Sequence, residues 1–259
     1  STDIAVRRMN LNGATYGVFA TGPATRRILV ERCAWLQDPA IWDKVAWTEI
    51  HDPPHPRREL DGDFFRSWNI GGDVTIRRNH ISHAFNGVHF FVDPDAAASG
   101  RLNDNVWIYE NTFSFIRDNA VEAEHVATNW FVFANRVLNC HVWIAFEDCS
   151  GGHWYVFGNR GWFTRKPGPP WDCNTGGGII KAANNRSRRP DHPFYYFNNS
   201  FYVRGPYIKK GALDHFRHFD NALQFARERH HPEGLVVDGR NPFASAGPDP
   251  RCDGVETIG

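Results

Sequence analysis

The sequence predicts an all-β protein folded as a single-stranded, right-handed parallel β-helix, and two observations lead to this class. An apolar-x-apolar-x-x-Asn-x-apolar segment occurs at residues 106–113 and again at 130–137. Each copy is followed, nine residues after its Asn, by a second alternating segment, at 120–124 and at 144–147. Alternation with a period of two indicates β-strands. A two-strand unit repeated at a fixed period of about 20–50 residues is typical of a solenoid whose coils stack about 4.8 Å apart.

The same frame recurs along most of the chain. Besides the two central units, it begins at Ile4, Ile28, Val74, Trp154 and Phe194. We therefore expect about seven coils over residues 3–210, within one domain that comprises residues 1–259. Residues 37–72 break the frame, which predicts a long loop insertion on one face of the solenoid. The frame is also lost over 211–259, where we expect a short helix at 214–231 and an irregular tail.

Asparagine occupies the same position of the frame in most units. These residues are Asn79, Asn111, Asn135, Asn159 and Asn199. We expect them to lie at a bend of each coil, where stacked Asn side chains bond the backbone of the turn and one another. This structural role is favoured over a functional row of asparagines.

Charge and composition limit the classes of partner. Lys plus Arg and Asp plus Glu number 29 each, so no net charge attracts nucleic acid or a membrane surface. No run of 18 apolar residues predicts a membrane-spanning helix, and no signal peptide is visible. Because the chain opens almost directly on a predicted strand, we expect that a capping segment was removed or lies outside this sequence. The five cysteines lack metal-binding spacing, and the many aromatic residues include some available for stacking on sugar rings.

The second strand of each coil predicts a surface rich in charged side chains. If Val88, Val121 and Ile144 point into the core, the residue after each points outward. Side chains of one column then lie about 5 Å apart in adjacent coils. The predicted outward column reads Phe19, His89, Glu122, Ala145, Lys181 and Lys209. The next outward column reads Phe91, Glu124 and Glu147, and the adjoining turns carry Arg117, Asp118, His125 and Asp148. The register of the sixth coil stays open by one residue, between Ile179 and Ile180.

Three glutamates stacked this closely need compensation by a cation, by a raised pKa or by flanking lysines. Carboxylates gathered with His and Lys on one sheet are also what acid–base chemistry on a sugar requires. A solvated outer face with ion pairs such as Glu122–Lys181 is the structural alternative.

The repeat V-x-I-x-x-N-x-[FI] with a following G-V resembles the coils of the pectate-lyase-like superfamily, over about residues 3–210. That resemblance implies the fold, whereas activity varies widely on this scaffold. The E-x-E at Glu122 and Glu124 is similar to chondroitinase B and its alginate-lyase relatives. In that family two such glutamates, with an Asn from a neighbouring coil, hold Ca²⁺ against a uronate carboxylate, while a Lys and an Arg transfer protons. Here His125 and Glu147 stand where that family places its Lys and Arg. His89, Lys181 or Tyr207 would have to substitute.

The resemblance favours a carbohydrate-active enzyme, first a polysaccharide lyase that cleaves a uronic-acid polymer by β-elimination with Ca²⁺ as cofactor. The residues expected to be catalytic are His89, Glu122, His125, Glu147 and Lys181. Those expected to bind the metal are Asp118, Glu124 and Glu147. Those expected to contact substrate are Asp61, Asp63, Arg117, Trp143, Tyr207 and Lys209.

Two alternatives stay open. A glycoside hydrolase would use two of the carboxylates, and carboxyl groups about 5 Å apart would favour retention of configuration. The other alternative is a non-catalytic carbohydrate-binding or structural β-helix. C5-epimerisation of the sugar is a minor variant of the lyase hypothesis. In each case we expect a secreted or periplasmic protein that meets a polysaccharide or oligosaccharide, and no nucleic acid or membrane partner. The oligomeric state is left open.

Overall fold

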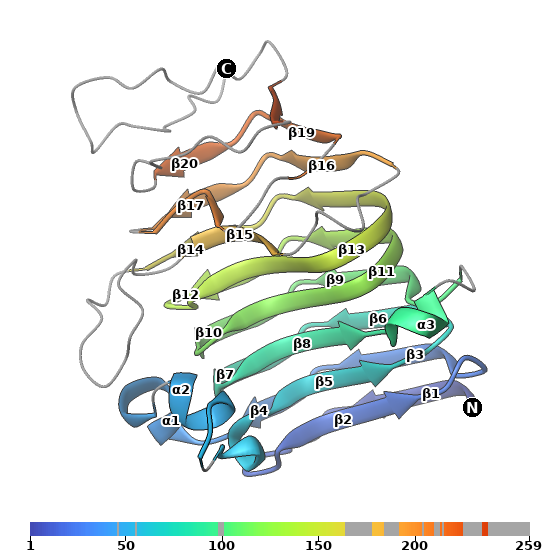
Figure 1. Cartoon of the computed structure of the whole chain (residues 1–259), viewed down its shortest axis with the longest axis vertical. Helices are drawn as coiled ribbons and strands as arrows, with labels where there is room; N and C mark the ends of the chain where they lie inside the picture. The colour runs from blue at the N-terminus through green and yellow to red at the C-terminus, as the bar shows by residue number, and fades with distance from the viewer. Residues whose placement is uncertain are drawn as a thin grey trace.

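The computed structural model describes residues 1–45, 47–54, 56–97, 101–163, 178–183, 192–203, 205–209, 213, 215–224 and 235–237. Over these residues the chain winds into a parallel β-helix, in which coil stacks on coil from the N-terminus upward (Figure 1). Every pair of neighbouring strands runs parallel. The predicted fold class is confirmed.

Each coil contributes strands to three faces. The first face holds β1 (Thr2–Arg7), β3 (Arg26–Glu31), β6 (Gly72–Arg77), β9 (Asp104–Tyr109), the second half of β11 (Asn119–Phe133), the second half of β13 (Val142–Phe157), β16 (Phe194–Phe197), β19 (Phe216–Phe219) and β21 (Leu235–Val237). The second face holds β2 (Tyr16–Thr21), β5 (Asp63–Trp68), β8 (Asn86–Phe91), the first halves of β11 and β13, β15 (Gly178–Ala183) and β18 (Ile208–Lys209). The third face holds β4 (Ala34–Leu36), β7 (His80–Ala84), β10 (Thr112–Ile116), β12 (Arg136–Leu138), β14 (Arg160–Trp162), β17 (Ser200–Tyr202) and β20 (Ala222–Gln224).

The predicted insertion is shorter than expected. Residues 63–68 form β5, which pairs with β2 on one side and with β8 on the other and so belongs to the second face. The segment before β5 holds α1 (Pro39–Lys44), α2 (Trp47–His51) and the 3₁₀ helix η1 (Arg58–Leu60). A further short helix, α3 (Pro94–Ala97), follows β8. The prediction was wrong for 63–68 because Phe64-Phe65 stands there in place of the Gly-Val of the two neighbouring strands, Gly17-Val18 in β2 and Gly87-Val88 in β8.

The solenoid continues beyond residue 210, where the sequence predicted its end. Within the range expected to form a helix, 216–219 and 222–224 are strands that pair with β16 and β17. The frame persists there as Phe216-x-His218-x-x-Asn221-x-Leu223, with all four named side chains buried. The sequence did not predict this unit because His218 stands at a frame position where most other units have Val or Ile. In the part of the chain that the structure describes, nine strands stack on the first face instead of seven, while residues 225–234 and 238–259 lie outside that part.

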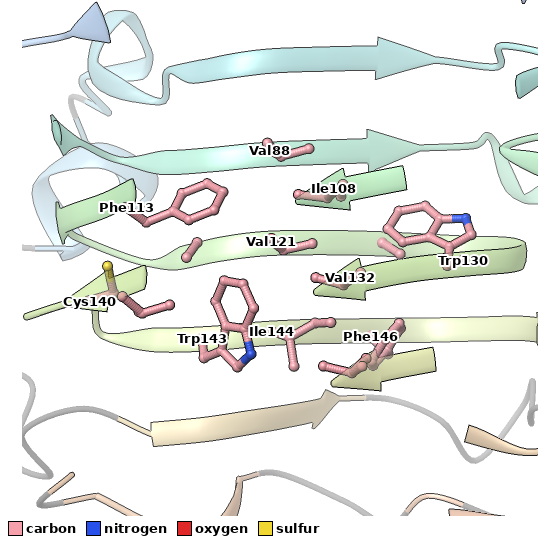
Figure 2. Close-up of a cluster of buried hydrophobic side chains, with 14 of the residues drawn as sticks. Val88, Ile108, Phe113, Val121, Trp130, Val132, Cys140, Trp143, Ile144 and Phe146 are labelled. Atoms are coloured by element: carbon pink, nitrogen blue, oxygen red, sulfur yellow. The ribbon is translucent and has the colours of Figure 1, made fainter. Parts of the chain in front are cut away.

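Apolar side chains from successive coils fill the interior. Figure 2 shows Val121 and Ile144 one above the other on β11 and β13, with Trp143 and Phe146 projecting beside them. Burial of such side chains contributes about 25 cal/mol per Å² of apolar area removed from water. Cys140 lies in the same core with its thiol buried.

The asparagines form an uninterrupted ladder at one bend, as predicted. Oδ1 of Asn135 accepts bonds from the backbone N–H and Nδ2 of Asn111, at 3.0 and 3.1 Å. Nδ2 of Asn135 in turn donates to the carbonyl of Ile108 at 2.9 Å. Asn221 extends the ladder at one end, and the backbone N–H of Cys33 donates into it at the other. The ladder therefore satisfies buried turn backbone in every coil that it crosses.

Asn135→Ala is expected to lower the free energy of unfolding by roughly 2–4 kcal/mol, because it leaves two buried backbone groups unpaired. Those groups are the N–H of Asn111 and the carbonyl of Ile108. Urea unfolding measures the change. The matched control is Asn12→Ala, which removes one exposed bond to the N–H of Leu36 and should cost under about 0.5 kcal/mol. Equal effects of the two substitutions would contradict the role of the ladder.

Candidate functional site

The second face carries the predicted charged column, and we call its outward surface the wall: the outward side of β2, β5, β8, β15, β18 and the first halves of β11 and β13. Strand pairing places the column members side by side in the predicted order. Ile180 lies opposite Ile144, which fixes the register of the sixth coil. Arg66 of β5 enters the column between Phe19 and His89. Glu124 and Glu147 lie opposite each other in the next column.

Glu122 is the buried centre of the wall, with only 3% of its surface exposed. Nδ2 of Asn119, on the same strand, donates to its Oε1 at 2.8 Å. Lys181 Nζ lies 3.6 Å from the same oxygen, and His89 Nδ1 lies 3.7 Å from Oε2. The coil before Glu122 and the second coil after it thus bring a histidine and a lysine to opposite sides of one carboxyl group.

Both ring nitrogens of His89 are engaged. Nε2 lies 2.9 Å from Oε1 of Glu124, and Nδ1 lies 2.8 Å from Nη1 of Arg66. Arg66 also donates to Oδ2 of the fully buried Asp63 at 3.0 Å. Although burial lowers the pKa of His89, the acidic groups Glu122 and Asp63 and the hydrogen bonds to Asp63 and Glu124 raise it well above its ordinary value. A histidine held this way is a poor acceptor for a further proton.

The two glutamates of β11 lie in opposite electrostatic environments. Burial raises the pKa of Glu122 to about 8, against the lowering effect of His89 and Lys181. Burial also raises the pKa of Glu124, but its hydrogen bond to His89 and the charges of His89 and Arg66 outweigh burial, so the net direction is downward. Near neutral pH, Glu122 is therefore protonated while Glu124 is ionised. Glu124 is also more open to solvent, with its side chain 20% exposed.

The far end of the wall is basic. Nζ of Lys181 bonds Oε2 of Glu147 at 3.3 Å, and Nζ of Lys209 donates to Nε2 of His141 at 2.8 Å. Burial lowers the pKa of Lys181, but the acidic groups Asp118, Glu122 and Glu147 outweigh burial, so the net direction is upward. Lys181 therefore keeps its proton. Asp118 lies within the field of these cations: burial raises its pKa, and Lys181, His141 and Lys209 bring it below its ordinary value.

The predicted metal ligands are not the set that the fold brings together. Ligand atoms of His89, Glu122 and Glu124 all lie within 4.8 Å of one another. Glu124 belongs to this group as predicted, whereas Asp118 lies near the lysines and Glu147 pairs with Lys181. Calcium prefers oxygen ligands, and one of these three donors is an imidazole nitrogen. The residues therefore fit Ca²⁺ poorly, and a divalent cation that accepts nitrogen and oxygen suits them better.

Three residues expected to contact substrate lie inside the protein. Trp143 packs in the core against Phe113 and Phe201, and Tyr207 packs against Tyr196. Both precede a core residue at the start of a second strand, where side-chain alternation breaks down and consecutive residues are buried. Arg117 is also buried, and its Nε donates to the carbonyl of Val45 beneath the insertion. None of the three offers an exposed group to a sugar.

The other predicted residues lie at the edges of the wall. Asp63 is buried in it, and Asp61 pairs with Arg58 of η1 at 2.9 Å. His125 lies at the corner where β11 leaves the wall, with Nδ1 3.8 Å from Asp148.

Three residues of the site were missed from the sequence: Arg66, Asn119 and His141. Arg66 falls in the range taken as insertion, and the spacing of Asp63 to Arg66 was the available signal. Asn119 precedes Glu122 by three residues, as Asn86 precedes His89, and this recurrence could have identified it. His141 is distant from Lys209 in sequence, so only the stacking of coils reveals their contact.

The chain, a parallel β-helix with one charged wall, significantly matches no protein-family model, no curated protein and no solved structure. In the described residues, no helix has the length and apolar character needed to cross a membrane.

Proposed function

We propose that the wall is the active surface of a carbohydrate-active enzyme that hydrolyses a polysaccharide. The observation that carries this proposal is the pair Glu122 and Glu124, two carboxyl groups on one strand whose environments drive their pKa values in opposite directions. Glycoside hydrolysis needs such a pair, one protonated and one ionised. The alternative of a glycoside hydrolase is thus better supported than the lyase that sequence resemblance favoured.

The proposed roles follow from the protonation states. Glu122 donates its proton to the glycosidic oxygen, and the ionised Glu124 attacks the sugar carbon and forms a glycosyl–enzyme intermediate. Water then hydrolyses this intermediate while Glu122 takes back a proton. Retaining enzymes hold their two carboxyl groups about 5–5.5 Å apart. Oxygens of Glu122 and Glu124 come within 4.8 Å of each other, which favours retention over inversion.

β-Elimination is the second candidate. The ligand atoms of His89, Glu122 and Glu124 lie within 4.8 Å of one another, close enough to coordinate one cation, and this favours it. Such a cation would bind the uronate carboxylate and make the adjacent C5 proton more acidic. The weakness of this candidate is the base: His89 has both nitrogens engaged, and Lys181 is held protonated. Hydrolysis needs neither group as a base.

The test is a panel of acidic and neutral polysaccharides, each incubated with Ca²⁺, with a transition-metal ion and with chelator. The proposal expects new reducing ends with no ultraviolet absorbance from unsaturated sugar, in every condition. If the products absorb in the ultraviolet and chelator abolishes them, the reaction is cation-dependent β-elimination and the proposed hydrolysis is contradicted. The absence of both products would favour the non-catalytic alternative. A polysaccharide substrate agrees with the expected secreted or periplasmic location.

A further inference from the structure

The first coils of the wall carry exposed aromatic side chains instead of charges. Phe19 is 54% exposed, Tyr16 39% and Trp68 37%. In the part of the chain that the structure describes, the exposed large apolar side chains are Met9, Tyr16, Phe19, Trp68 and Tyr202, so three of the five lie on this face. Grouped apolar exposure of this kind marks a binding surface more often than scattered single residues do.

These aromatic residues are continuous with the proposed catalytic pair. Phe19 lies opposite Arg66 in the column that continues through His89 to Glu122. Trp68 lies opposite Phe91 in the next column, where Glu124 follows on β11. Phe19 and Trp68 therefore occupy the same two rows as the carboxyl groups, and these rows run along the helix axis from coil to coil, while Tyr16 lies beside them in the row of Asp63.

The rings are held in place by their neighbours. Tyr16 and Phe19 stack with their centroids 5.5 Å apart, and Trp68 packs on Phe91 at 4.3 Å. Nε1 of Trp68 donates to Oδ2 of Asp93 at 3.0 Å, which fixes the rotation of the indole. A rigid, half-exposed ring with its N–H already bonded presents an apolar surface at little cost in conformational entropy.

We propose that Tyr16, Phe19 and Trp68 form an aromatic platform that stacks against pyranose rings of the polysaccharide on the N-terminal side of Glu122 and Glu124. Pyranose rings present apolar C–H faces that suit aromatic side chains, and hydroxyl groups at their rims suit donors such as Arg66. The inference rests on the proposed function in taking the bound chain to be the one that is cleaved. The substrate then lies along the helix axis, from the platform across the carboxyl pair towards Lys209.

Binding is measured by calorimetry in the Glu122→Gln background, which removes cleavage, with hexasaccharides from pectate, alginate, chondroitin and cellulose as probes. Trp68→Ala and Phe19→Ala are each expected to weaken binding of the best probe about tenfold. Tyr202→Ala is the matched control, because Tyr202 is similarly exposed but lies on the third face. It should leave affinity unchanged. Equal affinities for Trp68→Ala and Tyr202→Ala, or no binding of any probe, would overturn the platform.

The platform and the proposed hydrolysis can fail separately. If sugar binding depends on Trp68 but the wild-type protein releases no product, the platform is supported and the proposed hydrolysis is contradicted. If the polysaccharide is cleaved with the same KM by wild type and Trp68→Ala, the platform is contradicted and the proposed hydrolysis is supported. Analytical sedimentation tests a further possibility. If the protein is a dimer that Phe19→Ala dissociates, and it binds no sugar, the aromatic surface is a contact between copies of the chain and the platform is contradicted.

Discussion

Glu122→Gln is expected to lower kcat by about 10²–10⁴-fold while substrate binding is retained, because Gln keeps the shape of Glu122 but has no acidic proton to donate. Nδ2 of Asn119 can still donate to the side-chain oxygen at this position. The wild-type rate should fall as pH rises through about 8, where Glu122 loses its proton. In the variant this alkaline limb should be absent from the residual rate. Initial rates across pH on the best substrate of the panel provide the measurement.

Glu122→Gln should also change how the free energy of unfolding depends on pH. Because the folded pKa of Glu122 is raised above its ordinary value of 4.5, the native state retains a proton that the unfolded chain releases. Wild-type stability should therefore fall between about pH 5 and about pH 8, by on the order of a few kcal/mol. Glu122→Gln should flatten this dependence. Glu110→Gln, at an exposed carboxylate paired with Arg78, is the control and should leave the slope unchanged. A slope shared by all three proteins would contradict a protonated Glu122.

Lys181→Met is expected to lower the free energy of unfolding by roughly 1.5–3 kcal/mol, since it removes a charged hydrogen bond to Glu147, whose side chain is 26% exposed. The side chain of Lys181 is 10% exposed, and its Nζ lies 3.3 Å from Glu147 and 3.6 Å from Glu122. Methionine preserves most of the apolar volume, so the loss is mainly electrostatic. The change is measured by urea unfolding at neutral pH.

An exposed ion pair provides the comparison for Lys181. Arg78→Met removes the partner of Glu110 where both side chains are largely in water, and it should cost under about 0.5 kcal/mol. The double substitution Lys181→Met with Glu147→Gln should recover part of the loss, because it also removes a carboxylate that Lys181 neutralised. A cost for Lys181→Met as small as that for Arg78→Met would show that the wall is solvated and that its ion pairs contribute little.

The repeat made the fold and the order of the wall predictable. Once Val121 and Ile144 were assigned to the core, alternation placed Glu122 and Glu124 outward, and equal spacing in successive coils brought His89 and Lys181 to either side. The pairing of strands confirms this register. The prediction succeeded because parallel stacking converts a sequence period directly into spatial neighbours.

Three kinds of residue lay beyond that reasoning. Trp143 is the second residue of β13 and Tyr207 directly precedes β18, where the chain leaves a turn and alternation no longer assigns a side. Arg66 follows an insertion, so its place in the column depends on pairing that its own sequence does not reveal. His218 replaces an aliphatic residue of the frame, and its burial beside Phe216 depends on the coil below. In each case a long-range contact outweighs the local pattern.

The central claim, that one carboxyl group of the wall is protonated beside an ionised one, is tested most directly by NMR titration of the glutamate side-chain carboxyl carbons. Comparison of wild type with Glu122→Gln and with a Glu124→Gln variant assigns the two signals. The account predicts that the Glu122 signal titrates near pH 8 and the Glu124 signal below its ordinary range. Two signals that titrate together with the exposed glutamates would contradict it.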